Sequence, residues 1–165
     1  MSTSHYRLLL THLQKLIDNP EDGIKTSTTE ALHQIAESIH RRSLVVIFTD
    51  MMEQSEDTDK LFSTLQHLKH NKHEVVLFHV VDKKKELEFE FENRPYIFID
   101  METKEEVKLQ SNQVKEYYVE QMAKFQEQLK VKCLQYKVDF VEADIQRGFR
   151  PILQAYLVKR NKMSR

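Results

Sequence analysis

The chain contains very little glycine and almost no cysteine. Its 165 residues include two glycines and one cysteine. Glycine-rich loops that cradle phosphate groups need several glycines, so nucleotide binding through a loop of that kind is excluded. The single Cys133 cannot form an internal disulfide or a cysteine-based zinc site. A lone cysteine also suits a reducing compartment.

Neither sign of charge dominates, and long apolar runs are absent. The formal net charge is -1, with 40% hydrophobic and 31% charged residues. The chain as a whole therefore has no electrostatic attraction for nucleic acid or for an anionic membrane. No apolar run approaches the roughly 20 residues of a membrane span, and the first residues do not resemble a signal peptide. We expect a cytoplasmic protein without nucleic-acid or membrane partners.

Three apolar runs predict buried parallel strands. Ser43–Asp50 (SLVVIFTD) and Glu74–Asp82 (EVVLFHVVD) are almost continuously apolar, and each ends on an aspartate. Such runs are typical of strands that are covered by helices on both faces. Val138–Asp144 (VDFVEAD) predicts a third strand of this kind. Ligands of parallel sheets bind beyond the carboxyl ends of the strands, so Asp50 and Asp82 lie where chemistry is expected.

Apolar residues at helical spacing predict five helices around these strands. The helices are expected at about residues 4–19, 28–42, 57–71, 112–136 and 149–162. The fold class is therefore α/β, with three layers and a mainly parallel sheet that has helices on both faces. Leu65 and Leu129 belong to the predicted buried stripes, and replacing either by alanine is expected to cost about 2–5 kcal/mol.

The segment between the second strand and the fourth helix has a different pattern. Leu87–Phe91 (LEFEF) and Tyr96–Met101 (YIFIDM) alternate strictly between apolar and polar residues and flank a turn that contains proline. This alternation is typical of a half-exposed β-ribbon, to which Glu105–Leu109 adds a third short strand. We expect residues 86–110 to form a ribbon insertion in a single domain of residues 1–165.

The most apolar strand is predicted to lie at an exposed edge of the sheet. Ser43–Asp50 is the first strand of the chain, whereas the central strands of a doubly wound sheet have neighbours on both sides. An exposed apolar edge invites pairing with another chain. Either the polypeptide is the C-terminal part of a larger domain, or it completes its sheet elsewhere. We expect strand edge 43–50 to be paired in a homodimer or to remain open.

The histidines give little support for a metal site. His67, His70 and His73 lie three residues apart, and two imidazoles at this spacing on a helix can share a metal ion. Three of them drift around the helix, so we interpret them as surface histidines. We interpret His79, within the second strand, as a core or interface histidine whose hydrogen bonds are satisfied. Cys133 lies on an apolar stripe and is interpreted as a core residue.

Several segments, in order along the chain, resemble a known family. They are KTSTTEALHQIAESIHRRSLVVIFTDMME (25–53), HEVVLFHVVD (73–82), RPYIFIDMETKEE (94–106) and the end that begins with VDFVEAD. These segments are similar to the C-terminal half of proteins of the domain of unknown function fifty-eight family, whose members contain a von Willebrand factor A-like domain. The resemblance implies a partial von Willebrand A or Rossmann-like sheet that lacks its first strands, with Ser43–Asp50 as the fourth strand.

The resemblance also implies a divalent-cation site at the carboxyl edge of the sheet. In related von Willebrand A domains, the ligands come from a DxSxS motif after the first strand, a loop threonine and an aspartate after the fourth strand. Asp50 matches this aspartate, and Thr26 matches the threonine, with Thr28 and Thr29 as alternatives. No Asp-x-Ser-x-Ser occurs in the sequence. We therefore expect Mg²⁺ binding in a complete domain and an incomplete site in this chain.

The resemblance suggests a non-enzymatic protein–protein interaction module. Its expected partner is a MoxR-type AAA+ ATPase, with a divalent cation bridging to a partner carboxylate where the site is complete. The alternative is a magnesium-dependent phosphohydrolase that uses the strand-end aspartates Asp50, Asp82 and Asp144. The simpler interpretations are that Asp82 and Asp144 are solvated carboxylates, and that the threonines before the second helix are N-caps.

Overall fold

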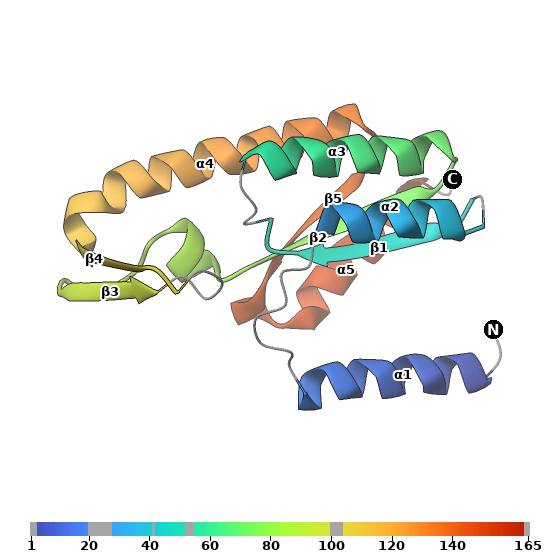
Figure 1. The fold of residues 1–165 in the computed structure, drawn as a ribbon, viewed down its shortest axis with the longest axis horizontal. Coiled ribbons are helices and arrows are strands. Elements are labelled where there is room, and N and C mark those ends of the chain that lie inside the picture. Colours follow the sequence, from blue (N-terminus) through green and yellow to red (C-terminus); the bar gives the residue numbers. More distant parts are fainter. Residues whose placement is uncertain (1–2, 20–27, 41, 52–54, 100–103, 164–165) are drawn as a thin grey trace. The chain divides into compact units, whose positions relative to one another are not determined.

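The computed structural model describes residues 3–19, 28–40, 42–51, 55–99 and 104–163. In chain order (Figure 1), its elements are α1 (Thr3–Asp18), α2 (Thr28–Ser38), β1 (Leu44–Thr49), α3 (Ser55–His70), β2 (Glu74–Val81), the short π-helix η1 (Lys83–Leu87), β3 (Pro95–Ile99), β4 (Glu106–Gln110), α4 (Ser111–Gln135), β5 (Asp139–Asp144), the 3₁₀ turn η2 (Ile145–Arg147) and α5 (Phe149–Met163). Within these ranges, the five predicted helices and the three predicted parallel strands are confirmed.

The three parallel strands form one sheet in the order β1-β2-β5. β1 and β2 pair so that Val46 lies beside Val76, and β2 and β5 pair so that Phe78 lies beside Val141. Because the strands run parallel, their carboxyl ends lie at the same edge of the sheet. The predicted α/β fold class, with a mainly parallel sheet, is confirmed.

Helices pack on both faces of the sheet. On one face lies the main core, to which α2, α3 and α4 contribute Leu32, Leu65 and Leu129 against Leu77 of β2. On the other face α5 packs through partly buried side chains against a smaller cluster on β2 and β5, and Figure 1 shows α5 on the opposite side of the sheet from α2 and α3. This second cluster consists of Val76, Phe78 and Ala143, with Val80, Val141, Ile152 and Tyr156 around it.

β1 lies at an edge of the sheet, and one of its faces is exposed. Within the residues described, no strand pairs with its outer side. Ile47, which faces α2 and α3, is only 8% exposed, whereas Leu44, Val46 and Phe48 are 45%, 43% and 68% exposed. The predicted edge position of this apolar strand is confirmed. Pairing with a second copy remains a prediction.

The small ribbon contains two of its three predicted strands, since β3 and β4 correspond to the predicted strands at 96–101 and 105–109. β3 pairs with β4 in an antiparallel two-stranded sheet, but Leu87–Phe91 is not a strand. It begins in η1 and continues as irregular backbone in which Phe89 has a φ of 48°. The Phe89 ring is buried and lies 4.7 Å from the Tyr118 ring and 5.9 Å from that of Phe98. The alternating pattern therefore reflects burial of every second side chain in an aromatic cluster, not strand pairing.

Helix α1 belongs to a compact unit separate from that of the sheet. None of its described side chains is buried. Leu8, Leu13 and Leu16 are 55%, 47% and 67% exposed. No helix in the described part of the chain is both long and apolar enough to cross a membrane.

Lysine, instead of glycine, occupies the left-handed position that ends two helices. Lys72 after α3 has a φ of 63°, and Lys137 after α4 has a φ of 56°. After α4, the Val138 amide donates to the Cys133 carbonyl at 2.8 Å, and the Lys137 amide donates to the Leu134 carbonyl at 3.1 Å. This is the Schellman arrangement, in which glycine is favoured because it has no Cβ. The positive charge of lysine suits the helix C-terminus, but its backbone is strained there.

Replacing Lys137 by glycine is expected to raise the free energy of unfolding by about 0.5–1 kcal/mol, because glycine adopts the left-handed conformation without steric strain. Urea denaturation of the wild type and the variant measures the difference. Lys115→Gly, which makes the same change within α4, is the control and is expected to lower stability by about 1 kcal/mol. Destabilisation by Lys137→Gly would contradict the proposed strain.

Leu129→Ala is expected to lower the free energy of unfolding by about 2–5 kcal/mol, because it leaves a cavity in the core. Leu65 and Leu129, both predicted to be buried, are 0% and 1% exposed. Leu134→Ala, on the same helix at a side chain that is 79% exposed, should change stability by less than about 0.5 kcal/mol. Equal effects of the two α4 variants in urea denaturation would show that this face of the helix is not buried.

Candidate functional site

Three aspartates lie at the carboxyl edge of the parallel sheet. Asp50 follows β1, Asp82 follows β2, and Asp144 is the last residue of β5. Asp50 is exposed, whereas Asp82 and Asp144 are 7% and 8% exposed. The three aspartates therefore differ in their exposure to solvent.

The carboxylate of Asp82 is held by hydrogen bonds from within the chain. Its Oδ1 accepts from the backbone amide of Lys85 at 3.3 Å, and its Oδ2 accepts from Nε2 of Gln146 at 3.0 Å. Burial by itself raises the pKa of Asp82, but the hydrogen bonds outweigh it, and the pKa lies below its usual value. Asp82 is thus the N-cap of η1 and connects it to the turn after β5.

Asp144 has the reciprocal role. Its Oδ1 accepts from the backbone amides of Gln146 at 3.1 Å and of Lys83 at 3.5 Å. Its Oδ2 lies 3.6 Å from Nε of Arg147. The prediction that Asp82 and Asp144 are solvated carboxylates is wrong, because each of them satisfies backbone amides in the turns that follow β2 and β5.

The backbone of Asp50 is held by a buried histidine on the neighbouring strand. His79 of β2 is 1% exposed, and its Nε2 lies 3.1 Å from the Asp50 carbonyl oxygen. Because a carbonyl can only accept, Nε2 carries the proton, and Nδ1 is an unprotonated acceptor. Nδ1 is buried and has no hydrogen-bond partner among the described residues. The interpretation of His79 as a core histidine is confirmed by its burial, but only one of its two ring nitrogens is satisfied within the described part of the chain.

Burial lowers the pKa of His79 below its usual value of 6.5. The hydrogen bond to the Asp50 carbonyl and the charges of Glu142 and Asp50 act in the opposite direction but do not cancel this effect. The imidazole of His79 is therefore neutral at neutral pH, and it is suited to holding the end of β1 in place.

His73 is also buried, although the sequence pattern predicted a surface histidine. It is 2% exposed, and its Nδ1 accepts from the backbone amide of Ser43 at 3.2 Å. It lies at the amino edge of the sheet, where it joins the starts of β2 and β1. His67 and His70, by contrast, are exposed as predicted. The signal for His73 is its place directly after the left-handed Lys72, since the residue after such a turn packs inward.

The described residues do not form a set of magnesium ligands. No group of three or more His, Cys, Asp or Glu side chains among them could hold a metal ion. Asp50 is the exposed strand-end carboxylate, while Asp82 and Asp144 bind amides. Thr26 lies outside the described residues. Mg²⁺ requires near-octahedral oxygen coordination, so this part of the chain does not fit it. The metal role of Asp50 and Thr26 remains a prediction.

The alternatives to Thr26 are not decided by the structure either. Helix α2 begins at Thr28, but the side chains of Thr28 and Thr29 lie outside the described residues. Their interpretation as N-caps or ligands therefore remains a prediction.

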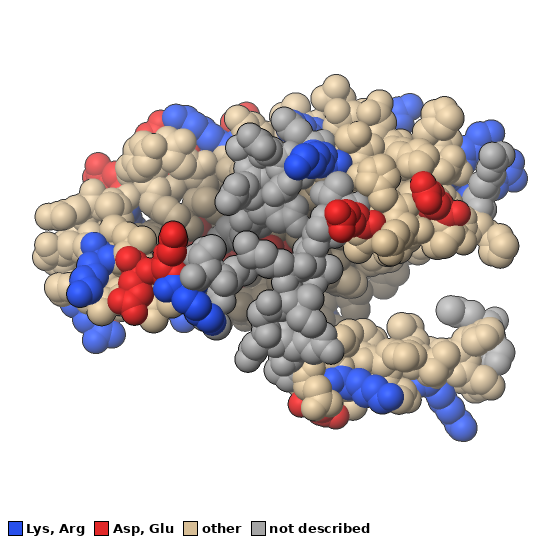
Figure 2. Space-filling view, viewed as in Figure 1, with Lys and Arg blue, Asp and Glu red and all other residues tan. Residues whose placement is uncertain are grey.

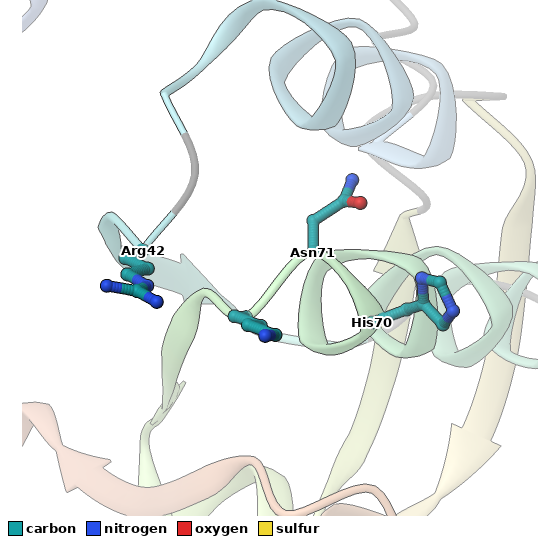
Figure 3. Close-up of a pocket in the computed structure, with 4 residues that line it drawn as sticks. Arg42, His70 and Asn71 are labelled. Atoms are coloured by element: carbon teal, nitrogen blue, oxygen red, sulfur yellow. The ribbon is translucent and has the colours of Figure 1, made fainter.

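A hollow lies at the other end of the strands. It has a volume of about 270 Å³ and is lined by Arg42, His70, Asn71 and Lys72. Figure 3 shows that the side chains of Arg42, His70 and Asn71 point in different directions and do not converge on the hollow. Binding sites for small molecules usually combine an apolar wall with a few convergent polar groups. This hollow therefore gives no support for a catalytic or cofactor site.

Charge of both signs is distributed over the surface of the chain. On the face shown in Figure 2, the described acidic and basic side chains are interspersed and do not form a continuous patch of one sign. Nucleic-acid binding requires a basic patch or stripe. This face does not provide one.

The fold defines an α/β chain with a parallel sheet, at whose carboxyl edge Asp50 is the exposed one of the three strand-end aspartates. The family model described as "Protein of unknown function DUF58" matches residues 1–128. The chain therefore belongs to this family, as its sequence pattern predicted. No curated protein and no solved structure matches it.

The wild-type protein is expected to lose stability as the pH falls, because protonation of His79 is unfavourable in the folded state. Because the pKa of His79 is below 6.5 in the folded state, the unfolded state binds more protons. The stabilisation is therefore fully present above pH 6.5 and is lost as the pH falls towards the lowered value. Urea denaturation measures the free energy of unfolding between about pH 7.5 and 5.5. The decrease over this range should be smaller in His79→Gln than in the wild type. His12→Gln, at an exposed position of α1, should retain it; an equal loss in all three proteins would exclude His79 as the cause.

Proposed function

We propose that this chain is a non-enzymatic protein-interaction module of the von Willebrand A-like type, and that its partner is a MoxR-type AAA+ ATPase. The observation that carries the proposal is the difference between Asp50 and the two other strand-end aspartates. Asp82 and Asp144 are buried and satisfy amides of the chain, whereas Asp50 presents an exposed carboxylate at the same edge.

The backbone around Asp50 is well suited to hold a recognition residue. The Asp50 carbonyl accepts from His79, and the Met51 amide donates to Oγ1 of Thr49 at 3.1 Å. Met51 is 2% exposed and has a φ of 57°, so the chain turns inward directly after Asp50. An exposed carboxylate on a fixed backbone can pair with a basic group of a partner, and such pairs favour specificity and rapid association.

The resemblance to von Willebrand A-like domains suggests a partner-dependent role. Ser43–Asp50 resembles the fourth strand of von Willebrand A domains, and this resemblance suggests for Asp50 the position from which a cation can be shared with a partner carboxylate. In a complete domain Mg²⁺ would supply this bridge. Among the described residues, only the Asp50 carboxylate is required for the proposed contact with the partner.

The contacts give less support to a magnesium-dependent phosphohydrolase. That reaction needs several carboxylates around one metal-binding space and a group that activates water. The carboxylates of Asp82 and Asp144 are directed to backbone amides and to Gln146. The buried His79 is bound to a carbonyl through Nε2. Asp82, Asp144 and His79 thus hold the backbone at the strand ends in place. The interaction module is therefore better supported than the enzyme.

Asp50→Asn is expected to weaken binding to a purified MoxR-type ATPase by at least about tenfold, or about 1.4 kcal/mol, because it removes the charge at the contact. Biolayer interferometry with the immobilised full chain measures the affinity, with and without Mg²⁺. Asp139→Asn makes the same change at the amino edge of the sheet and should leave the affinity unchanged.

Equal binding by the two variants would show that Asp50 is not in the contact. No binding by the wild type would contradict the choice of partner. Hydrolysis of a phosphate ester by the wild type, with loss of activity in Asp50→Asn, would favour the enzymatic alternative.

A further inference from the structure

The packing of α2 against α3 brings together two histidines that are far apart in the sequence. The two helices lie side by side (Figure 1), and Leu32 of α2 and Leu68 of α3 are buried in the same core cluster. His33 follows Leu32 and His67 precedes Leu68, and both histidines are exposed, so they lie at the rim of this contact. Their ring centroids are 6.2 Å apart, and the ring planes are inclined by 47°.

The separation of the two rings suits two imidazoles that bind one metal ion. With zinc–nitrogen bonds of about 2.1 Å, the centroids of two bound imidazoles lie roughly 5–6.5 Å apart, depending on the angle between the bonds. The observed 6.2 Å falls within this range. Because the side chains of His33 and His67 are exposed, rotation about their side-chain bonds can direct one nitrogen of each ring to the same ion without a shift of either helix.

The surroundings of this histidine pair favour a cation. Glu30 lies three residues before His33 and Glu37 lies four residues after it, so both carboxylates are its neighbours on one face of α2. Glu37 and His67 also line the same hollow, which has a volume of about 270 Å³. His67 lies in the last turn of α3, where the negative end of the helix dipole attracts positive charge.

The chemistry of the pair selects the kind of metal. Imidazole suits zinc, copper and nickel, whereas magnesium prefers oxygen ligands. In the described ranges no group of three or more His, Cys, Asp or Glu side chains could hold a metal ion, so His33 and His67 would share the ion with water at its other positions. The pair lies near the end of α3 that leads to the start of β2, whereas Asp50 lies at the carboxyl edge of the sheet.

We propose that His33 and His67 bind one transition-metal ion, with Zn²⁺ as the expected metal, and that this ion joins α2 to α3. Among the described side chains of α2, Leu32 and Ala36 are buried, so a metal bridge adds to a small apolar contact and stabilises the packed position of the helix. This inference goes beyond the proposed function, because it concerns other residues at another end of the sheet. A ligand from another part of the protein would add to the histidine pair and would not replace it.

Isothermal titration calorimetry of the full chain with Zn²⁺ tests the site. The wild type should bind a single ion with a dissociation constant of about 1–100 μM, and Mg²⁺ should not compete. His33→Gln and His67→Gln should each weaken zinc binding at least about tenfold, because one of the two nitrogen ligands is lost. His70→Gln, at an exposed position of the same helix, should bind as the wild type does. No saturable binding up to about 1 mM Zn²⁺, or an equal loss in His70→Gln, would overturn the proposal.

Nitrogen NMR of the histidine rings identifies the ligands directly. Zn²⁺ should shift the ring signals of His33 and His67 before those of the other histidines. It should also raise the urea midpoint of the wild type, because it binds the folded chain, and leave that of His33→Gln unchanged. Shifts spread equally over the exposed histidines would show adventitious binding only and would contradict the site. Because ATPase binding is assigned to Asp50, each of the two proposals can fail without the other.

Discussion

The near-complete burial of β2 is the constraint on which the sheet unit depends. Val75, Val76 and Leu77 are at most 1% exposed, because strands flank β2 on both sides and helices cover both of its faces. Apolar burial of this extent is the largest favourable contribution to folding. It fixes the register of β1 and β5 against β2. The register in turn brings the three strand-end aspartates to one edge.

At that edge, hydrogen bonds give the three strand-end aspartates different roles. Asp82 and Asp144 exchange contacts across the ends of β2 and β5, since each accepts from a group in the turn that follows the other strand. These bonds satisfy amide groups in the turns that follow the two strands and hold the turns together. Asp50, at the outer strand, takes no part in this exchange of contacts between β2 and β5. Its backbone is positioned instead by the neutral, buried His79.

The periodicity of apolar residues predicts most of the unit that contains the parallel sheet, because burial of apolar side chains determines its structure. The parallel strands, the helices and the edge position of Ser43–Asp50 all follow from apolar patterns. The same argument fails at Leu87–Phe91, where alternate side chains are buried without strand pairing. It also fails for Asp82, Asp144 and His73, since each of them has a hydrogen-bond partner 30 or more residues away. Apolar periodicity carries no information about contacts of that separation.

The tight turns that precede β2 and β5 have a consequence for how members of this family can vary in length. Each turn joins a helix to a strand through a left-handed lysine and one inward-packed residue, so an insertion there would displace the start of a buried strand. By contrast, the chain between β2 and α4 leaves the carboxyl edge and carries η1, β3 and β4 before it returns. An insertion in that segment would not displace the start of a buried parallel strand, so it would leave the register of the sheet unchanged.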